Sequence, residues 1–179
     1  MMNKISFVNN AVKFGLFLAS FSIILSLVYY ILEVQMFTFS FIAGNIILGL
    51  LFVISFFIFG IRNYRAKGLD GKITFGQAFA QGLAIGIVGY LIIGAYNYIF
   101  NAYIAPEYAA SQLDGFTQFM EKMNVPDETL DKAISDFQTN MQPFNQLKSA
   151  LVSGGIMSLI ISAIVAASIK KDTTEAEIV

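Results

Sequence analysis

Four long runs without a charged residue constrain this chain more than any other feature of its sequence. The runs hold 19, 28, 34 and 21 positions, between Lys13 and Glu33, Glu33 and Arg62, Lys72 and Glu107, and Lys148 and Lys170. A helix of about 20 predominantly apolar residues crosses a hydrocarbon core roughly 30 Å thick. Because hydrocarbon offers the backbone no hydrogen-bond partner, each run is expected to be helical.

The predicted fold class is therefore all-α, a four-helix transmembrane bundle forming a single membrane domain over residues 1–179. The spans are expected at about 14–32, 39–61, 75–104 and 150–169. A soluble bundle would need amphipathic helices, whereas these segments are apolar on every side. Thr74 followed three residues later by Gln77 is a capping-box pattern, which predicts that the third helix begins at Phe75.

Composition agrees with a membrane location and narrows the chemistry. Apolar residues make up 56% of the chain and charged residues 13%, whereas a soluble domain has about 25% charged residues. The sequence contains no His and no Cys, which excludes thiol nucleophiles, disulfides, His-dependent triads and the usual zinc or haem ligand sets. A net charge of −1 gives no basic surface for nucleic acid. We therefore expect no enzymatic activity and no cofactor.

Lys and Arg are concentrated on one side of a four-span topology. Eight of the 11 basic residues fall at the N-terminus, between spans two and three, or at the C-terminal end: Lys4, Lys13, Arg62, Arg65, Lys67, Lys72, Lys170 and Lys171. The other side holds only Lys122, Lys132 and Lys148. Since cytoplasmic loops carry the excess of basic residues, both termini are expected in the cytoplasm.

The one sizeable polar segment, residues 105–148, is expected on the outer face between spans three and four. Its apolar residues recur at steps of three and four, first at Leu113, Phe116, Met120 and Met123, then at Leu130, Ala133 or Ile134, Phe137 and Met141. This spacing predicts an amphipathic helical hairpin, with Pro126 opening its second helix. Its acidic residues lack calcium-loop spacing, so solvated helix faces are favoured over a cation site. Internal packing of the apolar stripe is favoured over a partner-binding groove.

Small residues follow one face of three spans, and in lipid such residues allow helices to approach closely. The predicted packing residues are Gly15 and Ala19 in the first span, Gly82 and Gly86 in the third, and Gly154, Ser158 and Ser162 in the fourth. A bundle closed on itself and a homo-oligomer both suit this pattern, and intramolecular packing is favoured.

No Asp, Glu, Lys or Arg lies inside a predicted span, which argues against a proton-coupled transporter or a voltage sensor. Asn45, Asn97 and Asn101 remain as candidates for the polar lining of a channel or transport path. Asn side chains also form structural hydrogen bonds between helices, and this interpretation is favoured.

Two stretches of sequence resemble a known family. They are Gly71–Phe79, which reads Gly-Lys-Ile-Thr-Phe-Gly-Gln-Ala-Phe, and Tyr96–Phe100 with the following Ile104–Glu107. Together they resemble the domain of unknown function 4199 family, small four-span bacterial membrane proteins without an established activity. The resemblance implies a multi-pass protein of the bacterial inner membrane, and it carries no catalytic or metal-binding residue to this chain.

The sequence thus favours a non-enzymatic structural or accessory membrane protein. Its expected partners are the lipid bilayer and, through the outer hairpin and the packed spans, another membrane protein, a lipid or a second copy of the chain. The alternative is a small channel or transporter, alone or as an oligomer.

Overall fold

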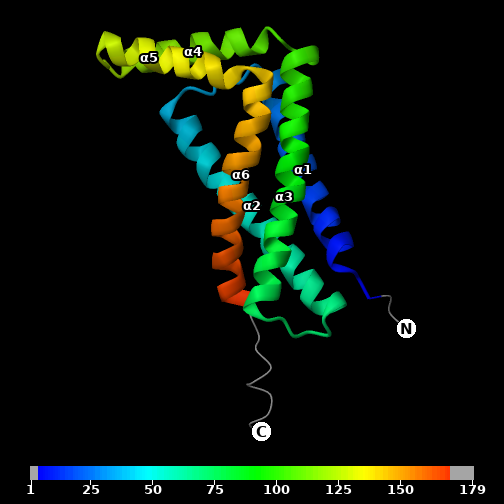
Figure 1. Ribbon diagram of the computed structural model, residues 1–179. Coiled ribbons are helices and arrows are strands. Elements are labelled where there is room, and N and C mark those ends of the chain that lie inside the picture. Colours follow the sequence, from blue (N-terminus) through cyan, green and yellow to red (C-terminus); the bar gives the residue numbers. More distant parts are fainter. Residues whose placement is uncertain (1–3, 170–179) are drawn as a thin grey trace.

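The computed structural model describes residues 4–169, and these residues form an all-α bundle, as predicted (Figure 1). The long helices are α1 (Phe7–Ile31), α2 (Phe39–Gly68), α3 (Phe75–Ile99) and α6 (Pro143–Ile169). The shorter helices are α4 (Tyr108–Lys122) and α5 (Asp127–Met141), and a single π-helical segment, η1 (Phe100–Ile104), continues α3.

Four helices of the described chain are long and apolar enough to cross a membrane, which confirms the predicted number of spans. They are α1, α2, α6 and the continuous helix Phe75–Ile104, whose limits match the predicted third span.

Three of the helices extend past the predicted limits. Helix α1 begins at Phe7, α2 continues to Gly68, and α6 begins at Pro143. The helices therefore run through Lys13, Arg62 and Lys148, the charges that bounded the predicted spans. Long basic side chains can reach water from a helix end while their stems cover apolar surface. The charges thus mark the limits of the apolar segment and not those of the helix.

Local signals in the sequence set the helix starts. The Gln77 backbone N–H donates to the Thr74 hydroxyl at 3.3 Å, and the Thr74 backbone N–H donates to Oε1 of Gln77 at 3.0 Å. The predicted capping box is therefore present at the start of α3. Ser6 and Thr38 cap α1 and α2 by accepting from the backbone N–H three residues on. Each cap satisfies a donor that the first helical turn leaves free.

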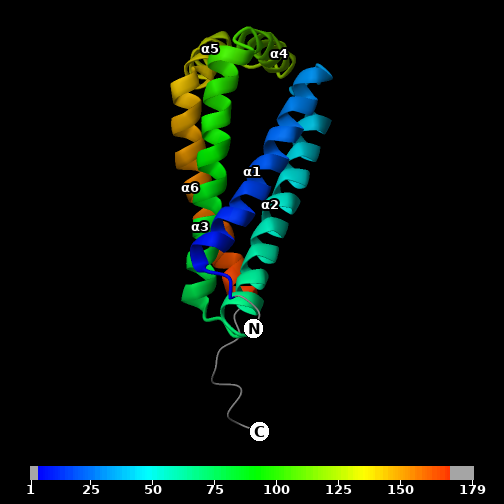
Figure 2. The same ribbon diagram turned by 90° about the vertical axis from the view of Figure 1, so that its right-hand side faces the viewer.

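The centre of the bundle is the pair α3 and α6, and α1 packs against α3 (Figures 1 and 2). The halves of α1 and α2 nearer to α4 and α5 lean away from this pair (Figure 2). Only Phe57, Gly60 and Ile61 of α2 are buried. The first half of α2 therefore presents its apolar side chains to the surroundings, as a helix in lipid does.

Helices α4 and α5 lie side by side across the end of the bundle, roughly perpendicular to α3 and α6 (Figure 1). The ring of Phe116 in α4 stacks on Phe137 in α5, with centroids 4.5 Å apart. Phe37, from the connection between α1 and α2, packs against both rings at 5.6 and 5.8 Å. This aromatic cluster fixes the helix pair to the α1–α2 connection.

Candidate functional site

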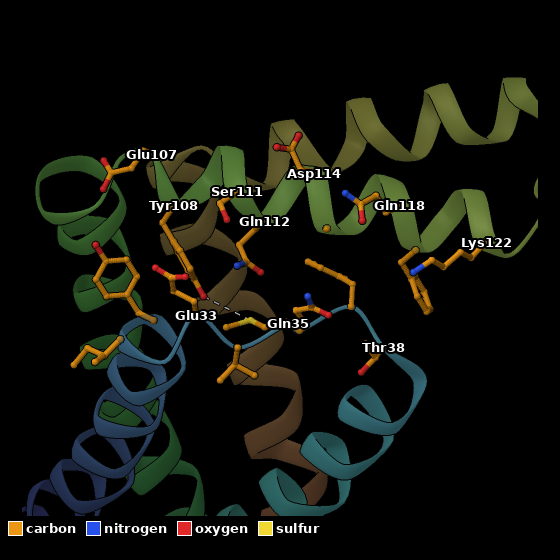
Figure 3. Close-up of a pocket in the computed structure, with 17 residues that line it drawn as sticks. Glu33, Gln35, Thr38, Glu107, Tyr108, Ser111, Gln112, Asp114, Gln118 and Lys122 are labelled. Atoms are coloured by element: carbon orange, nitrogen blue, oxygen red, sulfur yellow. Dashed lines mark hydrogen bonds between the residues drawn. The ribbon is translucent and has the colours of Figure 1, made fainter.

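A cavity of about 710 Å³ lies between α4 and the connection from α1 to α2 (Figure 3). We refer to it as the α4 cavity. Its lining residues come from the end of α1 (Tyr30 and Ile31), from the connection, and from one face of α4 between Glu107 and Lys122. The cavity thus lies at the end of α1, at the edge of the apolar spans.

Aromatic contacts at both ends of the cavity hold α4 above the connection. At the start of α4, the ring of Tyr108 packs edge-on against Tyr30, with centroids 5.2 Å apart and an interplanar angle of 90°. Farther along α4, Phe119 packs against Phe39 in the first turn of α2 at 5.2 Å. These two aromatic contacts set the distance between α4 and the connection, and the cavity lies between them.

The α4 cavity carries charges of both signs. Glu33, Glu107, Asp114 and Lys122 line it. In Figure 3, Glu33 lies beneath the first turn of α4 and Lys122 lies at the opposite end of the cavity, while Asp114 points away from the connection. Among the described residues the one ion pair joins Lys4 and Asp70, so Glu33 and Lys122 do not pair with each other. No group of three or more acidic side chains suited to a metal ion occurs in the described part of the chain.

Gln112 supplies a free amide to the same cavity. Its side chain points from α4 toward the connection (Figure 3), and the residue is only 8% exposed. None of the side-chain hydrogen bonds within residues 4–169 involves this amide, although it lines the cavity. Unlike the fully enclosed amide of Gln81, this amide is accessible from the cavity, so its donor and its acceptor can bind water or a ligand there.

Tyr108 presents a neutral phenol to the cavity. Its hydroxyl donates to Sδ of Met36 at 3.7 Å. Burial raises the pKa of the Tyr108 phenol above its ordinary value of 10.0, and the neighbouring Tyr96 and Tyr30 phenols act in the same direction. At neutral pH this side chain is therefore a ring and a hydrogen-bond donor, and not a base.

A second cavity of about 260 Å³ forms a groove between α1 and α2. We refer to it as the α1–α2 groove. Its lining is largely apolar and includes Phe21, Leu25 and Phe52. At one end of the groove the Tyr29 hydroxyl donates to Oδ1 of Asn45 at 3.0 Å. Tyr29 lines the groove and Tyr30 lines the α4 cavity, so the two sites begin at adjacent residues.

Of the three Asn residues predicted as a polar lining, Asn45 lies apart from Asn97 and Asn101, which are joined by a hydrogen bond. Asn45 lines the α1–α2 groove, whereas Asn101 lines a separate cavity of about 310 Å³ beneath α4 and α5. Nδ2 of Asn101 donates to Oε1 of Gln146 in α6 and to the backbone oxygen of Asn97, both at 2.9 Å. In the described structure Asn45 and Asn101 thus each join two helical elements, and a shared path through them stays a prediction.

The predicted small packing residues all lie in the interior: Gly15, Ala19, Gly82, Gly86, Gly154, Ser158 and Ser162 are buried. Gly82 faces Ser162, and a β-carbon on Gly82 would lie 2.7 Å from the Ser162 hydroxyl oxygen. Gly15 faces Val88 of α3, with a β-carbon position likewise 2.7 Å away. The faces that carry these residues are therefore occupied by other helices of the same chain.

Sequence reasoning missed the cavity residues Glu33, Gln112 and Lys122. Glu33 served only to delimit two spans, although a single acid between two long apolar runs marks a connection at the membrane boundary. Gln112 had a detectable signal, because it lies four residues after Tyr108 and four before Phe116. It is therefore a polar side chain on the apolar stripe of its helix.

A polar contact at the other end of the bundle was also missed. Nδ2 of Asn10 donates to the backbone oxygen of Gly60 at 2.9 Å, and Nδ2 of Asn63 donates to Oδ1 of Asn10 at 2.6 Å. Asn10 and Asn63 both fall outside the predicted spans, so the sequence analysis assigned them no role.

Gln81, close in sequence to the capping box, is fully buried, and neither atom of its amide has a partner in the described chain.

The fold defines a multi-pass membrane protein built as an all-α bundle, with a polar cavity at one end. The chain belongs to the family described as Protein of unknown function (DUF4199), whose model matches residues 13–171, and the expected family is thereby confirmed. Comparisons with curated proteins and with solved structures give no match.

Proposed function

We propose that this protein is a non-enzymatic accessory component of a bacterial inner membrane, and that it binds another membrane component, a lipid or a protein, in the α4 cavity. The observation that carries the proposal is the space of about 710 Å³ between α4 and the connection, into which the Gln112 amide points without a partner in the described chain (Figure 3). A site held open between two aromatic supports, with unpaired polar groups directed into it, is suited to receive a ligand.

A binding role fits the chemistry of the lining better than catalysis does. Ser111 is the one serine among the lining residues, and no hydrogen bond to a base activates its hydroxyl. Tyr108, with its raised pKa, is a poor base at neutral pH. The sequence offers no His or Cys for acid–base or nucleophilic work. Binding, by contrast, requires no proton transfer, because the carboxylates, the Gln112 amide and Lys122 can hold a ligand through charge and hydrogen bonds alone.

The charge distribution supports an orientation with the α4 cavity in the periplasm and both termini in the cytoplasm. Lys4 lies just before α1 and Lys13 lies in the second turn of α1, while Arg62, Arg65 and Lys67 lie near the end of α2. Helices α4 and α5 lie at the opposite end of the bundle (Figure 1). An excess of Lys and Arg near span ends favours the cytoplasmic side. Lys170 and Lys171, which belong to the predicted pattern, lie outside the described residues.

The alternative, a small channel or transporter, has less support. Asn45 and Asn101 line different cavities. The apolar part of α2 carries no charged side chain between Phe39 and Ile61. Selective flux into liposomes that contain only this protein would overturn the accessory role in favour of transport.

Purification in a mild detergent, followed by native mass spectrometry, tests the proposed function. We expect the wild-type protein to retain a lipid or a protein in stoichiometric amount and Gln112→Trp to lose it, because the indole fills the α4 cavity. Ser135→Trp is the matched control, since Ser135 is exposed on α5 and lines none of the cavities described above. Retention of only a second copy, unaffected by Gln112→Trp, would contradict the proposal, and so would retention of nothing.

A further inference from the structure

We propose that the free end of the α4–α5 pair is a lipid-binding surface, which lies on the bilayer with Met123 between the phospholipid headgroups and the start of the acyl chains. The free end comprises residues 119–126, the last turn of α4 and the turn that leads to α5. Met123 lines none of the cavities described above. The surface is therefore separate from the binding site of the proposed function.

The free end lies beyond the spans and faces the membrane. Helices α4 and α5 run roughly perpendicular to α3 and α6, so their axes are close to the membrane plane (Figure 1). The turn that joins them extends past the start of α2 (Figure 1). Among the described helices, α4 has extensive contact with α5 alone. The side of the free end that faces the spans is thus directed at the bilayer surface and not at another helix.

Phe39 fixes the level of α4 relative to the bilayer. It is the first residue of α2 and is 70% exposed, and almost none of the apolar stretch of α2 is buried within the protein. An exposed ring at the end of such a span lies at the boundary between lipid and water. Phe119 of α4 packs against this ring, with centroids 5.2 Å apart. The face of α4 that carries Phe119 therefore lies at the same boundary.

Met123 continues this face of α4 past the last aromatic contact. It lies four residues after Phe119, a spacing that places two side chains on one side of a helix, and its backbone is still helical. Phe116, nearer to the bundle, stacks on Phe137 of α5, whereas Met123 remains 47% exposed. The apolar stripe of α4 is thus packed within the protein at Phe116 and open at Met123. Because the lipid-facing surface of α2 continues through Phe39 and Phe119 to Met123, lipid is the partner that Met123 meets.

The charges at the free end favour contact through apolar side chains over attraction to anionic lipid. Glu121 lies two residues before Met123, and hence on the opposite side of α4. Lys122 is the one basic residue between positions 119 and 128, and it can extend to the headgroups from beside the apolar face. Asp127 and Glu128 follow in the first turn of α5. Helices that bind membranes by charge carry mainly Lys and Arg on their polar face, so binding at this acidic end is expected to be insensitive to salt.

Tryptophan fluorescence in vesicles tests the proposal, since the chain contains no tryptophan of its own. Each full-length variant is reconstituted in phosphatidylcholine vesicles, with or without bromine on the acyl carbons next to the ester groups, where it quenches nearby indoles. We expect the fluorescence of Met123→Trp to fall about twofold, because the apolar face of an interfacial helix lies about 5–10 Å into the boundary between headgroups and acyl chains. Both leaflets carry bromine, so the result does not depend on the orientation of the protein.

Two matched variants show whether the contact belongs to this face alone. Glu121→Trp places the indole on the opposite side of α4, and Ser135→Trp places it at an exposed position of α5. Both are expected to lose little fluorescence to bromine and to emit like an indole in water. Absence of quenching in Met123→Trp, or equal quenching in all three variants, would overturn the proposal. In vesicles with added phosphatidylglycerol, loss of the Met123→Trp quenching at high salt would overturn the assignment to apolar contact.

The other occupant that an exposed apolar face accepts is a second copy of the chain. In that case the indole of Met123→Trp is shielded from bromine, and its emission shifts when the protein is diluted in lipid; this outcome would overturn the lipid assignment. A nitroxide attached to Met123→Cys gives a second readout. We expect it to collide more often with oxygen, which concentrates in lipid, than with a water-soluble nickel chelate, and the reverse order would overturn the proposal. Circular dichroism confirms that each variant is folded.

This test and that of the proposed function are separate. If Gln112→Trp retains the same ligand as the wild type while bromine quenches Met123→Trp alone, the α4 cavity is not the binding site and the lipid-binding surface stands. If Gln112→Trp loses its ligand while bromine leaves Met123→Trp unquenched, the lipid-binding surface is wrong and the proposed function stands.

Discussion

Gly86 in α3 lies so close to Ser158 in α6 that a β-carbon on Gly86 would overlap the serine hydroxyl. That hydroxyl donates to the backbone oxygen of Gly154, one turn earlier in α6, at 2.6 Å. Ser158 is fully buried, so its side chain has no free space to enter. The close approach of the two central helices therefore depends on a residue without a side chain at position 86.

Gly86→Ala is expected to lower the free energy of unfolding by about 1–3 kcal/mol, the usual cost of overpacking a dense core. Gly155→Ala in α6 is the control, since no atom lies within 4 Å of its β-carbon position. It should be neutral, or stabilise by up to about 1 kcal/mol through helix propensity. Unfolding in mixed micelles, followed by far-UV circular dichroism, measures both. Equal effects of the two substitutions would contradict the assigned contact.

Asn10 connects α1 to α2 through its side-chain bonds to the Gly60 oxygen and to Asn63. Because Asn10 is 0% exposed, Asn10→Ala leaves a cavity and an unpaired Asn63 amide. The variant is expected to lose about 1–2 kcal/mol of stability in the same unfolding assay. Asn9→Ala serves as the control, because Asn9 is exposed and its side chain makes no bond in the described chain. A loss in Asn9→Ala as large as that in Asn10→Ala would refute the role given to the buried bond.

How far the sequence predicts this fold depends on whether a feature is local. The spans follow from apolar length, and the start of α3 follows from Thr74 and Gln77, which are three residues apart. The contact between Gly86 and Ser158 was anticipated only as a stripe of small residues on each helix. Which helix meets which stripe depends on the arrangement of the whole bundle, so the partner of Gly86 could not be named.

The α4 cavity was beyond sequence reasoning for a physical reason. Glu33 and Lys122 are distant in the chain, and they line one space only because α4 lies over the connection from α1 to α2. That placement is fixed by aromatic pairs such as Tyr30 with Tyr108, which periodicity cannot match to each other. Gln112 gave the one local signal, as a polar residue on an apolar stripe, and such residues are common on amphipathic helices.

Gln81 and Gln77 lie four residues apart on α3 and are expected to respond oppositely to the same substitution. The Gln81 amide is fully buried without a partner in the described chain. Gln81→Met removes this unsatisfied group at similar volume, and should raise stability by about 1 kcal/mol or more. Gln77→Met removes a capping bond and should lower stability by about 0.5–1 kcal/mol. If Gln81→Met is instead destabilising, the amide has a partner that the fold alone does not reveal.

The Tyr108 phenol makes stability depend on alkaline pH. Its pKa is raised above 10.0, chiefly by burial, so the folded chain holds this proton more tightly than the unfolded chain does. The resulting stabilisation is fully present below pH 10 and is lost as the pH rises through the raised pKa. The tyrosinate absorbance of wild type minus that of Tyr108→Phe should therefore titrate above pH 10 in the folded protein and near pH 10 in denaturant. Coincident titrations would show that the Tyr108 ring is not desolvated.

Two single cysteines test the orientation, since the chain contains no cysteine of its own. Ala66 is exposed in the last turn of α2, beside Arg65 and Lys67, and Ser135 is exposed on α5. Ala66 is a better choice than Gly68, where a β-carbon would lie 2.7 Å from the Tyr64 ring. Because basic residues are retained in the cytoplasm, a membrane-impermeant maleimide added to intact spheroplasts should label Ser135→Cys and spare Ala66→Cys. Permeabilised cells provide the control, in which both should react. Labelling of Ala66→Cys alone in intact spheroplasts would place the α4 cavity in the cytoplasm and reverse the proposed topology.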